Sequence, residues 1–305
     1  MKLTTNNREN IKFFLKNLYI PPANSHKGQN GKVLIVGGSK LFHSASLWAA
    51  ETASHFVDMV HYSSTAENSQ IFLALKTMFR NGIVVPQNQI PNYVREDDAI
   101  LIGPGMVRKE THSLKLVTRN FSEILTLNDE AEFTRELTHY LLYNFPEKRF
   151  VLDAGALQMM DPEFLKNRKT PVIITPHQGE FERMFKTSIT KLPVEEKQNK
   201  VKKFAKEYSC VILMKAVVDI ISDGEKIYVI EGGNQGLTKG GTGDILAGLT
   251  TAFYAKNDPL TSCILASFVE KLASEALEKK MGYWYNNHDL IAQIPASIKN
   301  LTDKI

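Results

Sequence analysis

A glycine-rich stretch near residue 240 has the residue types that phosphoryl transfer needs. Residues 240–243 read Gly-Gly-Thr-Gly, and Asp244 follows at the start of an apolar, helix-like run over residues 245–253. The N-terminus of a helix leaves backbone N–H groups free for an anion, and glycines let that backbone approach a phosphate closely. A carboxylate there would repel a bound phosphate, but it could take a proton from an attacking hydroxyl group. The alternative is a glycine-rich turn capped by Thr242 or Asp244, since both residue types are good N-caps.

The elements that must position this stretch alternate between short apolar runs and amphipathic runs. Strands are predicted at residues 32–36, 59–62, 83–85, 99–102, 150–152, 172–174 and 211–213, with a hairpin of 218–222 and 227–230 around Asp223-Gly224. Helices are predicted at residues 8–18, 45–55, 71–79, 194–208, 244–256, 260–279 and 287–300, with a helical turn at 182–185. Residues 111–145 are less regular and suggest two helices around a polar break. This alternation predicts an α/β fold with a mostly parallel central sheet and helices on both faces.

Residue types that often serve in ligand binding or catalysis follow several of the predicted strands. These loops are Gly37-Gly38-Ser39, Gly103-Pro104-Gly105, Asp153-Ala154-Gly155, Pro176-His177 and Met214-Lys215. Ligand sites in parallel sheets lie beyond the carboxyl ends of the strands, so these loops are expected to share one rim. Their convergence is a stronger indication of function than any one motif.

Each of these residues also has a simpler interpretation. His177 is a candidate ligand contact, although most isolated histidines are surface groups or satisfied hydrogen-bonding groups. Glu180 could hold a metal ion through water or cap a helix. Asp153 could face a magnesium-bound phosphate or only form a turn, and Lys215 could pair with a phosphate or be solvated.

The composition excludes several other classes of protein. The chain has 305 residues, 43% hydrophobic and 23% charged, with a formal net charge of +4. That charge is too small to indicate a nucleic acid or membrane partner, and the lysines of residues 197–206 are interpreted as a solvated helix face. Cys210 and Cys263 fit buried thiols in a reducing compartment. With no signal peptide and no apolar run able to span a bilayer, a cytoplasmic location is the default expectation. We expect a single domain over residues 1–305, with residues 1–20 as an N-terminal helical extension.

Taken together, the motifs resemble the ADP/ATP-dependent NAD(P)H-hydrate dehydratases of the ribokinase-like superfamily. The matching motifs are Ser25-His26-Lys27-Gly28 with Gly31, Val36-Gly37-Gly38-Ser39, Gly103-Pro104-Gly105, Asp153-Ala154 with Leu157, Thr175-Pro176-His177 with Gly179-Glu180, and Lys239 to Gly248. They follow the family's order and cover roughly residues 20–295. The last motif is shared across ribokinase-like enzymes, whereas the Ser-His-Lys-Gly and Thr-Pro-His-x-Gly-Glu motifs narrow the resemblance to the dehydratases.

The resemblance implies a ribokinase-like three-layer αβα sandwich and a carbon–oxygen lyase that repairs hydrated NADH or NADPH. The ring hydroxyl is phosphorylated from ADP or ATP with Mg²⁺, and phosphate then leaves. Asp244 would act as the base, with the backbone N–H groups of Gly241, Thr242 and Gly243 around the phosphoryl group. The substrate-contacting positions are Ala45, Gly103, Gly105, His177 and Asp244. The nucleotide-contacting positions are Lys215, Ala216, Val217, Val218, Asp219, Asn234 and Gly243, and Glu180 is the water-mediated metal candidate. Family members are often homo-oligomers.

The chain departs from the family pattern at Ala216, at residues 41–44, at Gly155 and in the insertion-like residues 111–145. Two other kinds of protein stay open on the sequence. A ribokinase-like kinase of a vitamin precursor, such as hydroxymethylpyrimidine or hydroxyethylthiazole, would share the glycine loop but would not need the two narrowing motifs. A non-catalytic nucleotide-binding protein would gain nothing from a carboxylate beside phosphate, which speaks against it.

Overall fold

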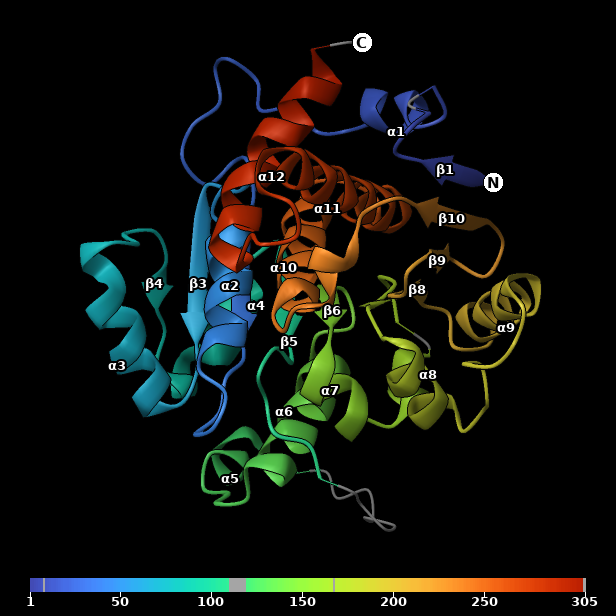
Figure 1. Cartoon of the computed structure of the whole chain (residues 1–305). Coiled ribbons are helices and arrows are strands. Elements are labelled where there is room, and N and C mark those ends of the chain that lie inside the picture. Colours follow the sequence, from blue (N-terminus) through green and yellow to red (C-terminus); the bar gives the residue numbers. More distant parts are fainter. Residues whose placement is uncertain (8, 110–118, 167, 304–305) are drawn as a thin grey trace.

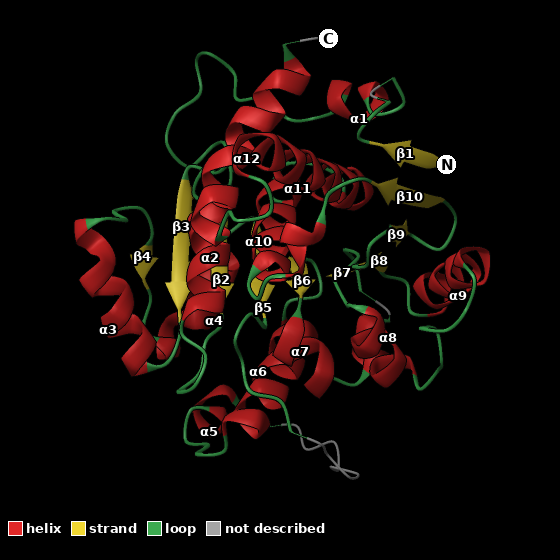
Figure 2. Ribbon diagram, in the orientation of Figure 1, coloured by secondary structure: helices red, strands yellow, loops and turns green. Residues whose placement is uncertain are grey.

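The computed structural model describes residues 1–7, 9–109, 119–166 and 168–303, and its strands form one twisted sheet (Figures 1 and 2). The order across the sheet is β1 (Lys2–Thr4), β10 (Ile227–Glu231), β9 (Asp219–Ser222), β8 (Val211–Met214), β7 (Ile173–Ile174), β6 (Arg149–Leu152), β5 (Ala99–Ile102), β2 (Lys32–Val36), β3 (Met59–Ser63) and β4 (Ile83–Val84). Neighbouring strands are parallel except that β9 is antiparallel to β8 and to β10. The predicted mostly parallel sheet and the β9–β10 hairpin are confirmed.

Helices cover both faces of this sheet, as predicted. One face packs against α1 (Lys12–Lys16), α2 (Ser44–Ala53), α10 (Thr242–Tyr254), α11 (Pro259–Met281) and α12 (Asn287–Thr302), and Phe72 of α3 (Ala66–Ala74) joins the same core. The other face packs against α4 (Ile90–Glu96), α5 (Phe121–Ile124), α6 (Glu130–Asn144), α7 (Ala154–Met159), α8 (Gln178–Phe185) and α9 (Val194–Glu207). The predicted three-layer αβα arrangement is therefore confirmed.

The continuous apolar runs of the strands follow from this double coverage. In β2, Val33 and Ile35 are buried in the core under α2 and α10, whereas Leu34 and Val36 are buried in the core on the opposite face. Successive side chains of a strand point to opposite faces, so a strand covered on both sides has apolar residues throughout. The same burial leaves the polar groups of the chain at the ends of the strands.

The N-terminal prediction is wrong in part. Residues 1–20 are not a helical extension, because Lys2–Thr4 form β1, which pairs in parallel with β10 at the edge of the sheet. Among the described residues of this stretch, only Lys12–Lys16 are α-helical, and Leu3, Ile11 and Phe14 are buried in the main core. A three-residue strand is too short for an alternation pattern, so the sequence could not indicate it.

Several helix boundaries also differ from the prediction. Helix α3 begins at Ala66 rather than at residue 71, because Thr65 caps it by accepting the Asn68 N–H, and residues 75–77 form a 3₁₀ turn. The short helices α4 and α7 were not predicted, and α8 is longer than the single predicted turn. In residues 111–145, α5 and α6 match the expected pair of helices from residue 121 onward, and residues 110–118 lie outside the described residues.

Candidate active site

The glycine loop adopts a conformation that only glycine takes up easily. Gly241 is the N-cap of α10 with φ +104°, and a Cβ there would lie 2.2 Å from the Trp48 ring and 2.1 Å from the Asn287 amide. Thr242 does not cap the helix, because its hydroxyl donates backwards to the carbonyl oxygens of Leu237 (2.8 Å) and Lys239 (3.0 Å). Since no side chain caps α10, its first turn keeps amide groups available for an anion.

One amide of the loop already has a partner. The Thr242 N–H donates to the Lys239 carbonyl at 3.3 Å, so this amide already has a partner. The use of all three amides around the phosphoryl group stays a prediction, and it would require the Thr242 N–H to leave this bond. The amide of Gly243, one residue further into the helix, has no partner inside α10 because the first N–H groups of a helix have none.

Lys215 lies directly against this helix terminus. A Cβ on Gly243 would come within 3.2 Å of the Lys215 Nζ. The same ammonium donates to Asp153 Oδ1 at 2.6 Å, and Thr175 Oγ1 donates to that oxygen at 2.9 Å. Lys215 is thus a partly buried, paired cation beside the glycine loop, and not a fully solvated lysine.

Asp244 lies among these charges. Burial and the neighbouring carboxylates of Asp153 and Glu180 raise its pKa to about 7, although the Lys215 ammonium acts in the opposite direction. Burial lowers the pKa of Lys215, but the carboxylates of Asp153, Glu180 and Asp244 outweigh it and hold that pKa above its usual value. A carboxyl group that titrates near neutral pH suits a general base, since it is free to accept a proton and also to release it.

His177 and Glu180 together cap helix α8. The His177 Nδ1 accepts from the N–H groups of Gly179 (3.0 Å) and Glu180 (3.3 Å), and Glu180 Oε2 accepts from the His177 N–H at 2.9 Å. The capping interpretation of Glu180 is therefore confirmed. The acceptor role of Nδ1 assigns the ring proton to Nε2, and the His177 side chain is 57% exposed on the rim.

The predicted convergence of the strand-end loops is confirmed by their contacts. The Gly38 N–H donates to the Pro104 carbonyl at 2.7 Å, which joins the loops after β2 and β5. A Cβ on Gly103 would lie 1.8 Å from the Asp153 carbonyl oxygen, so the loops after β5 and β6 pack closely against each other. The Lys215 N–H donates to the Pro176 carbonyl at 2.8 Å and joins the loops after β7 and β8.

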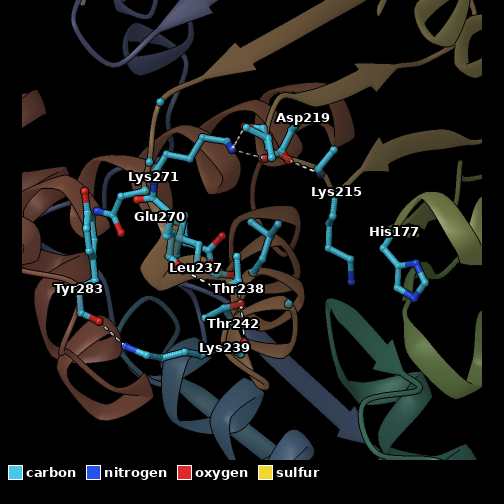
Figure 3. Close-up of a pocket in the computed structure, with 18 of the residues that line it drawn as sticks. His177, Lys215, Asp219, Leu237, Thr238, Lys239, Thr242, Glu270, Lys271 and Tyr283 are labelled. Carbon is cyan, nitrogen blue, oxygen red and sulfur yellow. Dashed lines mark hydrogen bonds and ion pairs between the residues drawn. The ribbon is translucent and has the colours of Figure 1, made fainter. Parts of the chain in front are cut away.

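A cavity of about 780 Å³ opens beside the glycine loop (Figure 3). Its described lining includes eight of the predicted residues: His177, Lys215, Ala216, Val217, Asp219, Asn234, Thr242 and Gly243. The described lining does not include Val218, Gly241 or Asp244. The evidence that Asp244 lies at the site is therefore its proximity to the charged groups of Asp153, Glu180 and Lys215, and not exposure to this cavity.

The remaining predicted substrate positions lie together further along the rim. A Cβ on Gly105 would meet the Cβ of Ala45 at 3.1 Å and the Cα of Gly38 at 3.2 Å, while Gly103 packs on Asp153. A smaller cavity of about 190 Å³ adjoins them, lined by residues 36–40, Met106 and the start of α6. Glu130 of α6 accepts the Lys40 N–H at 3.0 Å, so the region predicted as insertion-like forms part of this rim.

The comparison with known protein families decides the identity of the chain. The family model described as NAD(P)H-hydrate dehydratase matches residues 33–296. The chain belongs to the NAD(P)H-hydrate dehydratase family. The chain is 29% identical to the ADP-dependent (S)-NAD(P)H-hydrate dehydratase of Nitrosopumilus maritimus, over 98% of this chain and 99% of that protein. It is 30% identical to the enzyme of the same name from Cenarchaeum symbiosum, over 90% of this chain and 91% of that protein.

Other similar proteins are longer or share only the fold. The bifunctional NAD(P)H-hydrate repair enzyme Nnr of Methanocaldococcus jannaschii is 31% identical over 93% of this chain, which spans only 51% of that protein. The ADP/ATP-dependent NAD(P)H-hydrate dehydratase of Bacillus subtilis, co-crystallized with ATP/Mg²⁺, superposes with a TM-score of 0.76 at 22% identity over 95% of this chain and 96% of that one. The hydroxyethylthiazole kinase of Pyrococcus horikoshii gives a TM-score of 0.61 at 17% identity, over 96% of this chain and 97% of that one. That likeness shows the fold alone, whereas the family model favours the dehydratase interpretation over the vitamin-kinase alternative.

Sequence reasoning missed the contribution of α11 to the dehydratase-family cavity. Glu270, Lys271 and Glu278 line it together with Tyr283. Two consecutive charged residues in the otherwise apolar run of residues 263–273 were the available signal, since such residues are rarely buried without a reason.

Among the residues that the structure describes, no group of three close metal-ligand atoms lies at this site. The group of three close ligand atoms found among them is His61, Glu96 and Asp97, at the other end of the strands. Glu180 Oε1 accepts from Gln158 Nε2 at 2.9 Å, and its other oxygen caps α8. Within the same described ranges, no helix is both long enough and apolar enough to cross a membrane.

Proposed function

We propose that this protein returns hydrated NADH or NADPH to the reduced cofactor at the expense of an adenine nucleotide, as a carbon–oxygen lyase. The observation that carries the proposal is the position of Asp244, whose pKa is raised to about 7 at the N-terminus of α10 beside the Lys215 ammonium. Family membership supports the choice of hydrated nicotinamide cofactor over other alcohols.

The reaction follows from this geometry in two steps. Asp244 takes the proton of the ring hydroxyl, whose oxygen attacks the terminal phosphorus of the donor, so ADP leaves AMP. The ring C–O bond then breaks, phosphate leaves with the bonding electrons, and the neighbouring ring carbon gives up a proton as the double bond returns. Phosphate is a far better leaving group than hydroxide, which is why a phosphoryl-transfer site can promote a dehydration.

The chain's own groups account for binding and orientation. The free amides at the start of α10 and the Lys215 ammonium hold the donor's phosphates. We propose that His177 presents its Nε2–H to the substrate, while Ala45, Gly103 and Gly105 shape the neighbouring rim. Lys215 to Asp219 and Asn234 border the nucleotide, although Val218 is not part of the described cavity lining.

A divalent cation fits the charge balance of the site. Asp153, Glu180 and Asp244 bring three carboxyl groups to one buried ammonium, before any phosphate is added. Mg²⁺ is usually held by phosphates, water and at most one or two carboxylates, so Glu180 would hold it through water. When bound, Mg²⁺ neutralises charge on the transferred phosphoryl group.

The proposal is tested by incubating the protein with hydrated NADH or NADPH and Mg²⁺, with ADP, ATP or no nucleotide. The expected result is a nucleotide-dependent return of the reduced-nicotinamide absorbance, with ADP the better donor and AMP as its product. A preference for ATP would reject the choice of donor only. No recovery with either nucleotide, from protein shown to be folded, would reject the function.

A further inference from the structure

Glu270 is a buried charged residue in the wall of the cavity that the proposed mechanism leaves without a role. It lies in the middle of α11, it is 5% exposed, and it lines the cavity beside Lys271 (Figure 3). Lys271 is satisfied, because its Nζ donates to the Val217 carbonyl at 3.1 Å and pairs with Asp219 Oδ2 at 3.4 Å. By contrast, Glu270 Oε1 is buried with no hydrogen-bond partner among the described residues.

An unpartnered buried carboxyl group costs stability. Burial, followed by the nearby charge of Asp219, raises the pKa of Glu270 to about 8. An apolar side chain of similar size would avoid the desolvation of this group and would pack against the same neighbours. A residue that weakens the fold at the wall of a ligand cavity is best explained by an interaction with the ligand.

Most of the other polar side chains of the described wall have protein partners, and Gln235 is exposed to solvent. Asn234 accepts from the Gly236 N–H and donates to the Ser274 carbonyl, Asp219 accepts from the Ala216 N–H, and Thr238 donates to the Gln235 carbonyl. Lys239 donates to the Tyr283 and Tyr285 carbonyls. Glu270 is therefore the polar group of the described wall that stands out as lacking a partner of its own.

We propose that the Glu270 carboxyl group is the hydrogen-bonding contact of this protein for the nucleoside of the phosphoryl donor. The inference rests on the proposed function, which puts the phosphates against α10 and Lys215. Those groups occupy one end of the cavity, so the nucleoside must fill the remainder, which Leu237, Leu246 and Glu270 line. A protonated carboxyl group offers one donor and one acceptor, which match a ribose hydroxyl or the amino edge of adenine, and it adds no negative charge near the phosphates.

The test compares Glu270→Leu with Glu270→Gln, since leucine removes the polar group and glutamine retains a donor and an acceptor. The control is Glu225→Gln, which alters an exposed surface pair with Lys206 in the β9–β10 hairpin. ADP binding is measured by calorimetry, and stability is measured by thermal unfolding without ligand. We expect Glu270→Leu to weaken ADP binding at least about tenfold while its melting temperature stays equal or rises. Glu270→Gln and the control should bind within about threefold of wild type.

Two analogues identify the group that Glu270 contacts. In the wild-type protein, the analogue that lacks the contacted group should bind more weakly than ADP. If Glu270 contacts the ribose, this affinity difference between ADP and 2′-deoxy-ADP should disappear in Glu270→Leu. If Glu270 contacts the base, the difference between ADP and inosine diphosphate should disappear in that variant. Either result supports the proposal. If both affinity differences are the same in Glu270→Leu as in the wild-type protein, the proposal is overturned. Should leucine not fold, Glu270→Met serves as the apolar variant.

The outcomes also separate this inference from the proposed function. If the wild-type protein binds ADP and the apolar variant binds it equally tightly, Glu270 has no nucleoside contact and only this inference fails. If the wild-type protein binds neither ADP nor ATP, the proposed function fails and takes this inference with it.

Discussion

The Lys215 ammonium occupies the space that a side chain on Gly243 would need, since a Cβ there would lie only 3.2 Å from the Lys215 Nζ. The relationship joins a strand-end cation to a helix N-terminus, 28 positions further along the chain. It places a positive charge at the terminus where the helix dipole already favours an anion. The donor's phosphates are thus expected to meet both groups at once.

Gly243→Ala should therefore weaken binding of the donor without unfolding the protein. The φ angle of Gly243 is not positive, so alanine fits the helical backbone. The new methyl group would instead displace the flexible end of the Lys215 side chain. We expect the KM for ADP to rise at least about tenfold, the scale of one lost charge-assisted contact. Gly241→Ala is the contrasting variant, because φ +104° and the Trp48 ring leave no room for a Cβ, and it should lower the melting temperature strongly. Wild-type ADP kinetics in Gly243→Ala would contradict the shared phosphate site.

Asp244→Asn should abolish turnover and stabilise the protein. The folded pKa of Asp244 is about 7, above its ordinary value of 3.8. As pH rises between these values the unfolded chain ionises first, so stability is lost across this window, and the loss persists above pH 7. The variant should thus melt at a higher temperature than wild type at pH 8 and show little difference below pH 4. Activity should fall by orders of magnitude while ADP binding persists. Retained activity would remove Asp244 from its proposed role.

The same pKa predicts the pH dependence of the reaction. Asp244 must be ionised to accept a proton, so kcat/KM for the hydrate should rise with pH and level off above about 7. The Lys215 charge lowers the pKa of Asp244 and the Asp153 charge raises it. Lys215→Met should move the rise to higher pH, and Asp153→Asn should move it to lower pH. A rise that stays at the same pH in both variants would assign it to another group.

His177 offers a way to separate capping from substrate contact. Its Nδ1 accepts two backbone N–H groups at the start of α8, a role that asparagine also fills well. His177→Ala should cost about 1 kcal/mol of stability through loss of the cap, whereas His177→Asn should cost little. Both variants lose Nε2, so both should raise the KM for the hydrate. If His177→Asn keeps the wild-type KM, the histidine is only a cap.

The sequence was sufficient to predict the apolar strands, but it could not predict the short edge strand β1 or the arrangement of charges in the site. Apolar runs such as β2 are legible because a strand buried on both faces leaves no polar position. The pairing of Lys215 with Asp153 joins residues 62 positions apart, and no local pattern encodes it. The raised pKa of Asp244 likewise depends on Asp153 and Glu180, which tertiary packing brings near. Glu270 is hidden for the same reason, because its burial depends on the packing of α11 against the sheet.

The N-terminal segment, which the sequence suggested as a helical extension, contacts the wall of the cavity instead. Thr5 follows β1, is 3% exposed, and donates through Oγ1 to Glu275. The same Glu275 oxygen accepts the N–H of Gly233 at 2.9 Å, and Gly233 lines the cavity. Removing the Thr5 hydroxyl should free Glu275 and loosen the loop of residues 232–234.

Thr5→Val keeps the size of the side chain and removes this hydrogen bond. We expect a loss of about 1 kcal/mol of stability and a rise of about threefold or more in the Kd for ADP, with kcat at saturating ADP unchanged. Thr126→Val, on an exposed turn where the hydroxyl donates to the Glu123 carbonyl at 2.8 Å, is the matched control and should leave ADP binding unchanged. A Thr5→Val protein that is less stable but binds ADP like wild type would limit β1 to closing the edge of the sheet.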